Sequence, residues 1–404
     1  MELVEKLKGE SGSMIFRGKK LTDLQEEDLQ RLVDDQVQER DTVEYKRDMY
    51  GNSDADKREM LKDIASMANH RGGYLLIGID EDDEGVPTNV AGIESGNHVE
   101  RITSSCLDNI DKRIVGLGIK DIQLSNGRVV IAASIPESLN APHMITHQGV
   151  NQFWKRHGRQ KDKMTIDEIG EAFDRRLSDL NRLDRFLFTR KAQILEKVGD
   201  RTQMVVSASP AFLRDEIIFD SRDDNLRQMI LNPPNQLLLP RGQISCGQPY
   251  PTINGLRADQ STPYYNSPSS NQYIEVFLNG YIEFGKRIDR EHEYGVFIAS
   301  GVEIPSIVNF MQFIQVIYER YLSLTPLVVN FSIFNARGIW LAIRRHLSED
   351  SSKVQWQEQH LELGKFYVEN ISEQRELRTK AICDRLYQAF NREGCDLFDN
   401  AVTF

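Results

Sequence analysis

Hydrophobic and polar positions recur at two different spacings in the first part of the chain. Residues 21–37 and 57–69 carry apolar side chains close to the 3.6-residue period of a helix, and a Gly-Gly pair follows the second run. Residues 42–46 alternate as a half-buried strand does, whereas residues 74–79 form the continuous apolar run of a buried strand. We therefore expect helices over the first two ranges and strands over the last two.

The pattern continues to residue 187 with helices and strands in mixed order. An Asn-Gly pair at 126–127 lies between two apolar segments and predicts a hairpin turn. Thr165 and Glu168 have the spacing of a capping box and predict the start of a helix. Such a mixed order favours one α/β or α+β domain. The expected elements are a helix at 97–111, a hairpin over 120–124 and 128–135, a strand at 152–155 and a helix at 165–187.

The pattern changes after residue 187. A helical segment continues to about residue 198, and residues 232–272 are rich in Pro, Gly, Asn and Ser, which predicts long loops. An Asn-Gly pair at 279–280 predicts the turn of a further hairpin. The other elements expected in this half are strands at 205–208, 217–219 and 294–299, a hairpin over 273–284, a helix at 304–324, strands within 326–343 and a helix at 373–390.

These elements predict an α+β (mixed α/β) protein with two main domains. Residues 1–38 would form an N-terminal helical extension, and residues 39–186 a domain with a mixed sheet and flanking helices. Residues 187–404 would form a second α+β domain, in which the sequence shows no motif of known chemistry.

Composition is that of an ordinary globular protein, with 40% hydrophobic and 27% charged residues. No segment approaches the roughly 18 apolar residues of a membrane helix. The four cysteines lie far apart without a CxxC pair, which argues against a structural zinc site and a disulfide framework. We therefore expect a protein of the reducing cytoplasm with no membrane partner. The formal net charge of −11 argues against a protein that coats DNA, but it is compatible with a local basic groove.

Three carboxylates and a lysine are the candidate chemical groups near the first predicted strand. Glu39 precedes that strand, Glu44 and Lys46 project from one of its faces, and Asp80 follows the strand at 74–79. Clustered carboxylates suit a hard cation such as Mg²⁺ or Mn²⁺, which can activate water, and a nearby lysine can stabilise charge that develops on a phosphodiester. The alternative is that Glu44 and Lys46 form a surface pair and Asp80 belongs to a turn.

A basic run follows the strand expected at 152–155. Aromatic side chains beside lysines and arginines are typical of surfaces that bind single-stranded or looped RNA through base stacking and phosphate contacts. The alternative is a solvated loop. The candidate nucleic-acid-binding residues are Trp154, Lys155, Arg156, Arg159, Lys161 and Lys163.

Three stretches of this sequence resemble the AlbA-type domain of the Schlafen family. They lie within residues 39–173, and the third, at residues 151–165, matches the aromatic and Arg-Gly segment that precedes a helix in that family. The first two read Glu39-x4-Glu44-Tyr45-Lys46 and Ala65-x-x-Ala68-Asn69-x-x-Gly72-Gly73-Tyr74-Leu75-x-Ile77-Gly78-Ile79-Asp80.

The resemblance implies a metal-dependent ribonuclease, with tRNA as the expected substrate, that acts in bacterial defence against phage or stress. Carried over position by position, Glu39, Glu44 and Asp80 would hold Mg²⁺ or Mn²⁺, with Lys46 beside them. Asp82 is the alternative third carboxylate if the turn after the strand is one step longer. A homodimer and a partner protein from a defence system are further expectations.

Two other functions stay open. The chain could be a regulator that binds RNA or single-stranded nucleic acid through the same basic residues without cutting it. It could also be an interaction or sensor protein that acts through residues 187–404. Cleavage of RNA by the purified protein would distinguish a nuclease from both of these alternatives. The salt dependence of nucleic-acid binding tests the basic surface.

Overall fold

The computed structural model describes residues 15–16, 19, 21–213, 218–234, 242–260, 272–288, 291–292, 295–322, 325–343 and 354–396. The chain divides into an N-terminal unit, Met1–Leu180 with Tyr318–Pro326, and a C-terminal unit, Asn181–Ile317 with Leu327–Phe404. The boundary predicted between residues 186 and 187 falls inside helix α5 (Ile166–Val198), which runs from the one unit into the other.

A four-stranded mixed sheet forms the centre of the N-terminal unit. Its strand order is β1-β2-β7-β6, in which β1 is parallel to β2 and the other neighbours are antiparallel. The strands are β1 (Val43–Lys46), β2 (Gly73–Ile77), β7 (Val129–Ile135) and β6 (Gly118–Gln123). The helices are η2 (Leu21–Asp23), α2 (Glu26–Asp34), α3 (Asp54–Ala68) and α4 (His98–Asn109).

Strand β2 of this sheet is buried on both faces. Leu75 and Ile77 of β2 join a core cluster with residues of α3 and α4, whereas Tyr74 and Leu76 join a second cluster with residues of α2. A strand that is covered on both faces has no polar side, which explains the continuous apolar run at residues 74–79.

A small second sheet in the same unit was only partly expected. Its order is β10-β9-β8-β5, and β9 and β10 form an antiparallel hairpin. The basic run therefore lies on two paired strands, where the sequence suggested one strand and a loop. The elements are β5 (Ile110–Asp111), β8 (Met144–Ile145), η3 (His147–Gly149), β9 (Gln152–His157) and β10 (Gln160–Lys163), and the separate pair β3 (Asp80–Glu81) and β4 (Pro87–Asn89) follows β2.

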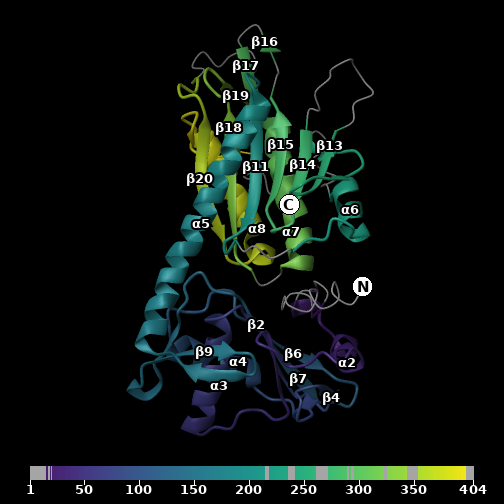
Figure 1. Cartoon of the computed structure of the whole chain (residues 1–404), viewed down its shortest axis with the longest axis vertical. Helices are drawn as coiled ribbons and strands as arrows, with labels where there is room; N and C mark the ends of the chain where they lie inside the picture. The colour runs from purple at the N-terminus through teal and green to yellow at the C-terminus, as the bar shows by residue number, and fades with distance from the viewer. Residues whose placement is uncertain are drawn as a thin grey trace. The chain divides into compact units, whose positions relative to one another are not determined.

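The C-terminal unit is built on a seven-stranded antiparallel sheet of order β12-β13-β14-β15-β11-β18-β20. In Figure 1 the end of α5 crosses one face of this sheet, with α7 and α8 behind it. The seven strands are β11 (Gln203–Pro210), β12 (Tyr250–Pro251), β13 (Gly255–Asp259), β14 (Gln272–Phe277), β15 (Ile282–Arg287), β18 (Leu327–Phe334) and β20 (Leu361–Val368). The remaining elements are α6 (Asp224–Leu231), β16 (Glu291–His292), β17 (Gly295–Ala299), α7 (Ser300–Tyr321), β19 (Trp340–Ala342) and α8 (Ile371–Gln388).

The α+β class is confirmed, and the differences from the expected elements are local. Strands β12 and β13 lie within residues 232–272, which were expected to be loops, and β20 was not expected at all. Residue 217 of the strand expected at 217–219 lies outside the described residues, and 218–219 are not in a strand. Among the described residues, no helix is both long enough and apolar enough to cross a membrane.

Candidate functional site

Strand β1 and the segment before it carry Glu39, Glu44 and Lys46. The side chains of Glu44 and Lys46 form an ion pair on one face of β1, while Tyr45 points to the other face and donates its hydroxyl to the carbonyl of Val37 at 2.7 Å. The backbone N–H of Glu39 donates to the carbonyl of Gly85 at 2.7 Å, which holds Glu39 against the turn between β3 and β4. Glu39 and Glu44 are both buried.

Two arginines of the β9–β10 hairpin neutralise these glutamates. Arg156 Nη2 lies 2.5 Å from Glu44 Oε2 and 3.6 Å from Glu39 Oε1, and Arg159 Nε lies 2.7 Å from Glu39 Oε2. Arg156 is only 1% exposed. Its interpretation as a phosphate contact on the surface is therefore corrected: it is an internal counter-ion of the glutamates. Arg159 differs, because its side chain is 41% exposed and covers Glu39 from outside.

The environments of the two glutamates shift their pKa values in opposite directions. Burial, followed by the neighbouring Glu44, raises the pKa of Glu39 to about 7. Burial would also raise the pKa of Glu44, but the charge of Arg156, the hydrogen bond with Glu39 and the charge of Lys46 outweigh it and lower that pKa to about 2. The pair therefore shares one proton up to near-neutral pH, and this proton resides mainly on Glu39.

A second carboxylate cluster, which the sequence reading missed, lies beside the first. Asp63 of α3 is fully buried, forms an ion pair with Lys161 of β10, and accepts a hydrogen bond from Tyr50 Oη at 2.5 Å. Lys161 also lies 2.7 Å from Glu59 Oε1. Burial, and then the charge of Glu44, raises the pKa of Asp63. A signal was present in the sequence: Asp63 interrupts the apolar face of the helix expected at 57–69.

Asp80 and Asp82 lie in different surroundings from the glutamate pair. Asp80 Oδ1 lies 3.2 Å from Arg47 Nε, and Asp80 Oδ2 accepts from Asn89 Nδ2 at 3.3 Å. Asp82 closes the turn before β4, since its carboxylate accepts the backbone N–H groups of residues 84 and 86 at 2.9 and 2.8 Å. One oxygen of Asp82, Oδ1, is therefore engaged in its own turn.

The cation site expected at Glu39, Glu44 and Asp80 requires three free ligands at one point. Among the described residues, no group of three or more His, Cys, Asp or Glu side chains is arranged to hold a metal ion. Glu39 and Glu44 lie together, but arginines occupy their oxygens. Mg²⁺ and Mn²⁺ prefer several unhindered oxygen ligands, so a cation would have to displace these arginines, and its assignment to this site stays a prediction.

The rest of the basic run is mostly engaged within the unit. Lys155 Nζ lies 2.5 Å from Glu168 Oε1, and Lys161 belongs to the Asp63 cluster. Trp154 packs against the core, and Lys62 Nζ covers its ring at 4.4 Å from the centroid. Lys163, at the end of β10, is exposed. Arg159 and Lys163 are therefore the cations of this hairpin that are best placed to meet a phosphate from solvent.

Comparison with known proteins gives a family for this unit. Residues 39–165 match the family model described as Schlafen, AlbA_2. A search of curated proteins found no match.

Two solved structures share a low similarity with part of the chain. The DIP2311 protein from Corynebacterium diphtheriae is 18% identical over 31% of this chain, with a TM-score of 0.24, and the chain spans 25% of its length. The N-terminal domain of a RecG-related protein from Nitrosomonas europaea, solved by NMR, is 20% identical over 34% of this chain and 92% of that domain, with a TM-score of 0.25. Such low scores carry no weight for function, so the assignment rests on the family model. Residues 39–165 are a Schlafen AlbA_2 domain.

Proposed function

We propose that the Schlafen AlbA_2 domain binds RNA and cleaves its phosphodiester backbone. The family itself supports a nucleic-acid-binding or nuclease-type function. The observation that carries the finer proposal is the Glu39–Glu44 pair, in which one carboxyl has a pKa of about 7 and its neighbour one of about 2. Two carboxyls whose pKa values are separated by their surroundings are suited to proton transfer near neutral pH.

The side chains present can serve each proton of an RNA cleavage step. Ionised Glu39 would take the proton from a 2′-hydroxyl, the 2′-oxygen would form a bond to phosphorus, and the bond from phosphorus to the 5′-oxygen would break. The carboxylates of Glu44 and Asp63 outweigh burial and raise the pKa of Lys46, so Lys46 stays protonated at neutral pH and carries the proton that the leaving 5′-oxygen needs. Arg159 covers Glu39 and is itself exposed, so a phosphate that draws Arg159 outward would uncover the base and be neutralised by the same arginine.

The assignment of Mg²⁺ or Mn²⁺ to Glu39, Glu44 and Asp80 stays a prediction, and the steps above do not use a cation. Four further expectations also stay predictions: tRNA as the substrate, a homodimer, a partner protein and a role in antiphage or stress defence. The cytoplasmic location also stays an expectation from the cysteines. Each of these needs its own measurement.

The proposal is tested by incubating the full chain with end-labelled tRNA and with single-stranded RNA, once with Mn²⁺ and once with a chelator. We expect cleavage that Glu44→Gln slows about tenfold or more, because one charged contact is worth about 1.5–3 kcal/mol and Gln no longer holds Lys46. Cleavage in the chelator supports the carboxyl pair as the acid–base system. Cleavage that requires Mn²⁺ supports the cation site. Intact RNA in both conditions at stoichiometric protein would overturn the nuclease proposal.

The second candidate is a regulator that binds nucleic acid without cleaving it. It is favoured by the arginines that already neutralise both glutamates. Both candidates require phosphate contacts from the exposed side of the hairpin.

The binding surface gives a prediction shared by both candidates. Lys163→Ala is expected to weaken RNA binding at low salt and to reduce the slope of log Kd against log salt by about 1, as the loss of one phosphate contact does. Arg128→Ala is the matched control, since Arg128 is an exposed cation of the same unit at the β6–β7 turn. Fluorescence anisotropy at four salt concentrations measures both slopes. Equal slopes for the two variants would show that Lys163 does not meet a phosphate.

A further inference from the structure

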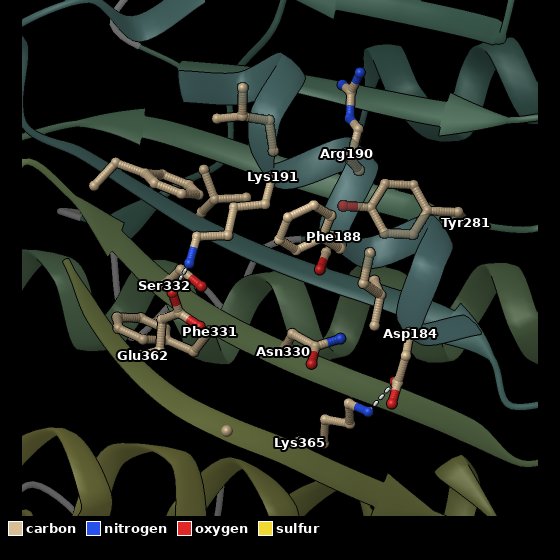
Figure 2. A pocket seen from close by; sticks show the side chains of 16 residues that line it. Asp184, Phe188, Arg190, Lys191, Tyr281, Asn330, Phe331, Ser332, Glu362 and Lys365 are labelled. Atoms are coloured by element: carbon tan, nitrogen blue, oxygen red, sulfur yellow. Dashed lines mark hydrogen bonds and ion pairs between the residues drawn. The ribbon is translucent and has the colours of Figure 1, made fainter. Parts of the chain in front are cut away.

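The C-terminal unit contains a cavity of about 360 Å³ that plays no part in the site above. It lies between the end of helix α5 and the sheet face formed by β11, β18 and β20 (Figure 2). This volume is at the lower end of the range for small-molecule sites, roughly 300–1,000 Å³. It is large enough for one small ligand.

The floor of the cavity offers uncharged hydrogen-bonding groups. Asn330 and Ser332 of β18 and Ser207 of β11 line it. The Nδ2 atom of Asn330 is buried and has no hydrogen-bond partner among the described residues. A buried amide donor without a partner costs about 1–3 kcal/mol, and an acceptor atom of a ligand would recover that cost.

Aromatic rings line the same space. Phe188 of α5 is 76% exposed, which is unusual for a large apolar side chain, and it lines the cavity. Tyr281 also lines the cavity, but it is only 2% exposed, and its hydroxyl donates to Glu283 Oε2 at 2.8 Å. Phe334 is part of the cavity wall and is likewise buried. Phe188 is therefore the ring that a flat ring system could stack on, and stacking on an aromatic side chain is worth about 1–3 kcal/mol per base.

Two ion pairs join α5 to β20 on either side of Asn330 (Figure 2). They are Lys191 with Glu362 and Lys365 with Asp184. The four side chains are 33–51% exposed, and ion pairs at such positions contribute only about 0–1 kcal/mol. Either lysine can therefore exchange its carboxylate for a ligand phosphate at little cost, because the bond to phosphate is a charge-assisted hydrogen bond as well.

We propose that this cavity binds a nucleoside monophosphate. The base would stack against Phe188 and place its acceptor edge on Asn330 Nδ2, and the phosphate would bind Lys191 or Lys365. Adenine is the expected base, because a carboxamide can both donate to its N7 and accept from its N6 amino group. The proposal is independent of RNA cleavage, since all of these residues belong to the C-terminal unit.

Isothermal titration calorimetry of the full chain with AMP, GMP, CMP and UMP tests the proposal. AMP is expected to bind most tightly, and adenosine and ribose 5-phosphate each at least about tenfold more weakly, because each lacks one of the two recognised groups. Absence of binding by all four nucleotides would overturn the proposal. Binding of ribose 5-phosphate as tightly as AMP would also overturn it, because the base would then contribute nothing.

Variants locate the binding within the cavity. Asn330→Leu keeps the size of the side chain and removes its amide, and it is expected to weaken AMP about tenfold. Lys191→Ala or Lys365→Ala, whichever removes the phosphate contact, is expected to weaken AMP binding by a similar factor and to leave adenosine binding unchanged. Lys197→Ala, an exposed lysine on the same helix, is the control and should bind as the wild type does. If Asn330→Leu fails to fold, the two lysine variants still test the site: weaker AMP binding by Lys191→Ala or Lys365→Ala would support it, and unchanged AMP binding by both would refute it.

Discussion

Replacing Arg190 by leucine is expected to lower the free energy of unfolding of the C-terminal unit by about 3–5 kcal/mol. Arg190 projects from α5 into the sheet, and its side chain is 3% exposed. Its Nε lies 2.8 Å from Glu283 Oε2, and its Nη2 lies 2.6 Å from Glu275 Oε2. Both glutamates are buried. Leucine would leave Glu283 without a positive partner in a site of low dielectric constant, which is the costly way to break a buried ion pair.

The remaining contacts of this cluster explain why Arg190→Leu would not lose all of the stability of the C-terminal unit. Glu283 also accepts hydrogen bonds from Tyr273 Oη at 2.9 Å and Tyr281 Oη at 2.8 Å, and Glu275 keeps Arg257 Nη1 at 3.0 Å. These groups would still solvate the carboxylates, but none of them replaces the bidentate cation on Glu283. The unit should therefore fold and be less stable.

Urea unfolding followed by circular dichroism measures the effect of Arg190→Leu. The control is Arg185→Ala, an exposed arginine of the same helix, which should stay within about 0.5 kcal/mol of the wild type. Combining Arg190→Leu with Glu283→Leu should restore part of the loss, because the uncompensated charge is then removed as well. A change below about 1 kcal/mol for Arg190→Leu alone would contradict the role given to this cluster.

The elements with regular periodicity could be read from the sequence. The expected helix at 57–69 and strand at 74–79 correspond to α3 and β2, because one apolar face or one fully apolar run is a local property. The β9–β10 hairpin could not be read in this way. Its inward side chains, Arg156 and Lys161, are charged. Arg156 is buried against Glu44, 112 residues away, and Lys161 is paired with Asp63, 98 residues away.

The candidate site could likewise be predicted only in part. Glu39, Glu44 and Lys46 lie within eight positions of one another, so alternation along β1 and the family motif are enough to group them. The position of Arg156 depends instead on the packing of a distant hairpin against β1. A run of basic residues in sequence looks like one surface, yet the structure buries Arg156 and exposes Arg159. Sequence alone gives no means of telling these two arginines apart.

Glu39→Gln is expected to lower the rate of RNA cleavage by about 10²–10⁴-fold, the usual contribution of a general base. The pKa of Glu39, raised to about 7 by burial and by Glu44, also fixes the pH dependence. Below this value most of the protein carries a protonated Glu39 that cannot accept a proton. The wild-type rate should therefore rise about tenfold per pH unit up to about pH 7 and level off above it. Glu84→Gln, an exposed carboxylate in the nearby β3–β4 turn, should keep both the rate and the profile.

Stability distinguishes a base from a structural residue at this position. The folded protein raises the pKa of Glu39 from its usual 4.5 to about 7, so it favours the protonated form. The stabilisation linked to this proton is complete below about pH 4.5 and is lost as the pH rises through about 7. The Glu39→Gln variant carries a neutral side chain at every pH, so it should be at least as stable as the wild type at pH 8 while cleaving RNA far more slowly. If the variant loses stability and activity together, or if the wild-type rate is flat between pH 5 and 8, Glu39 is not the base.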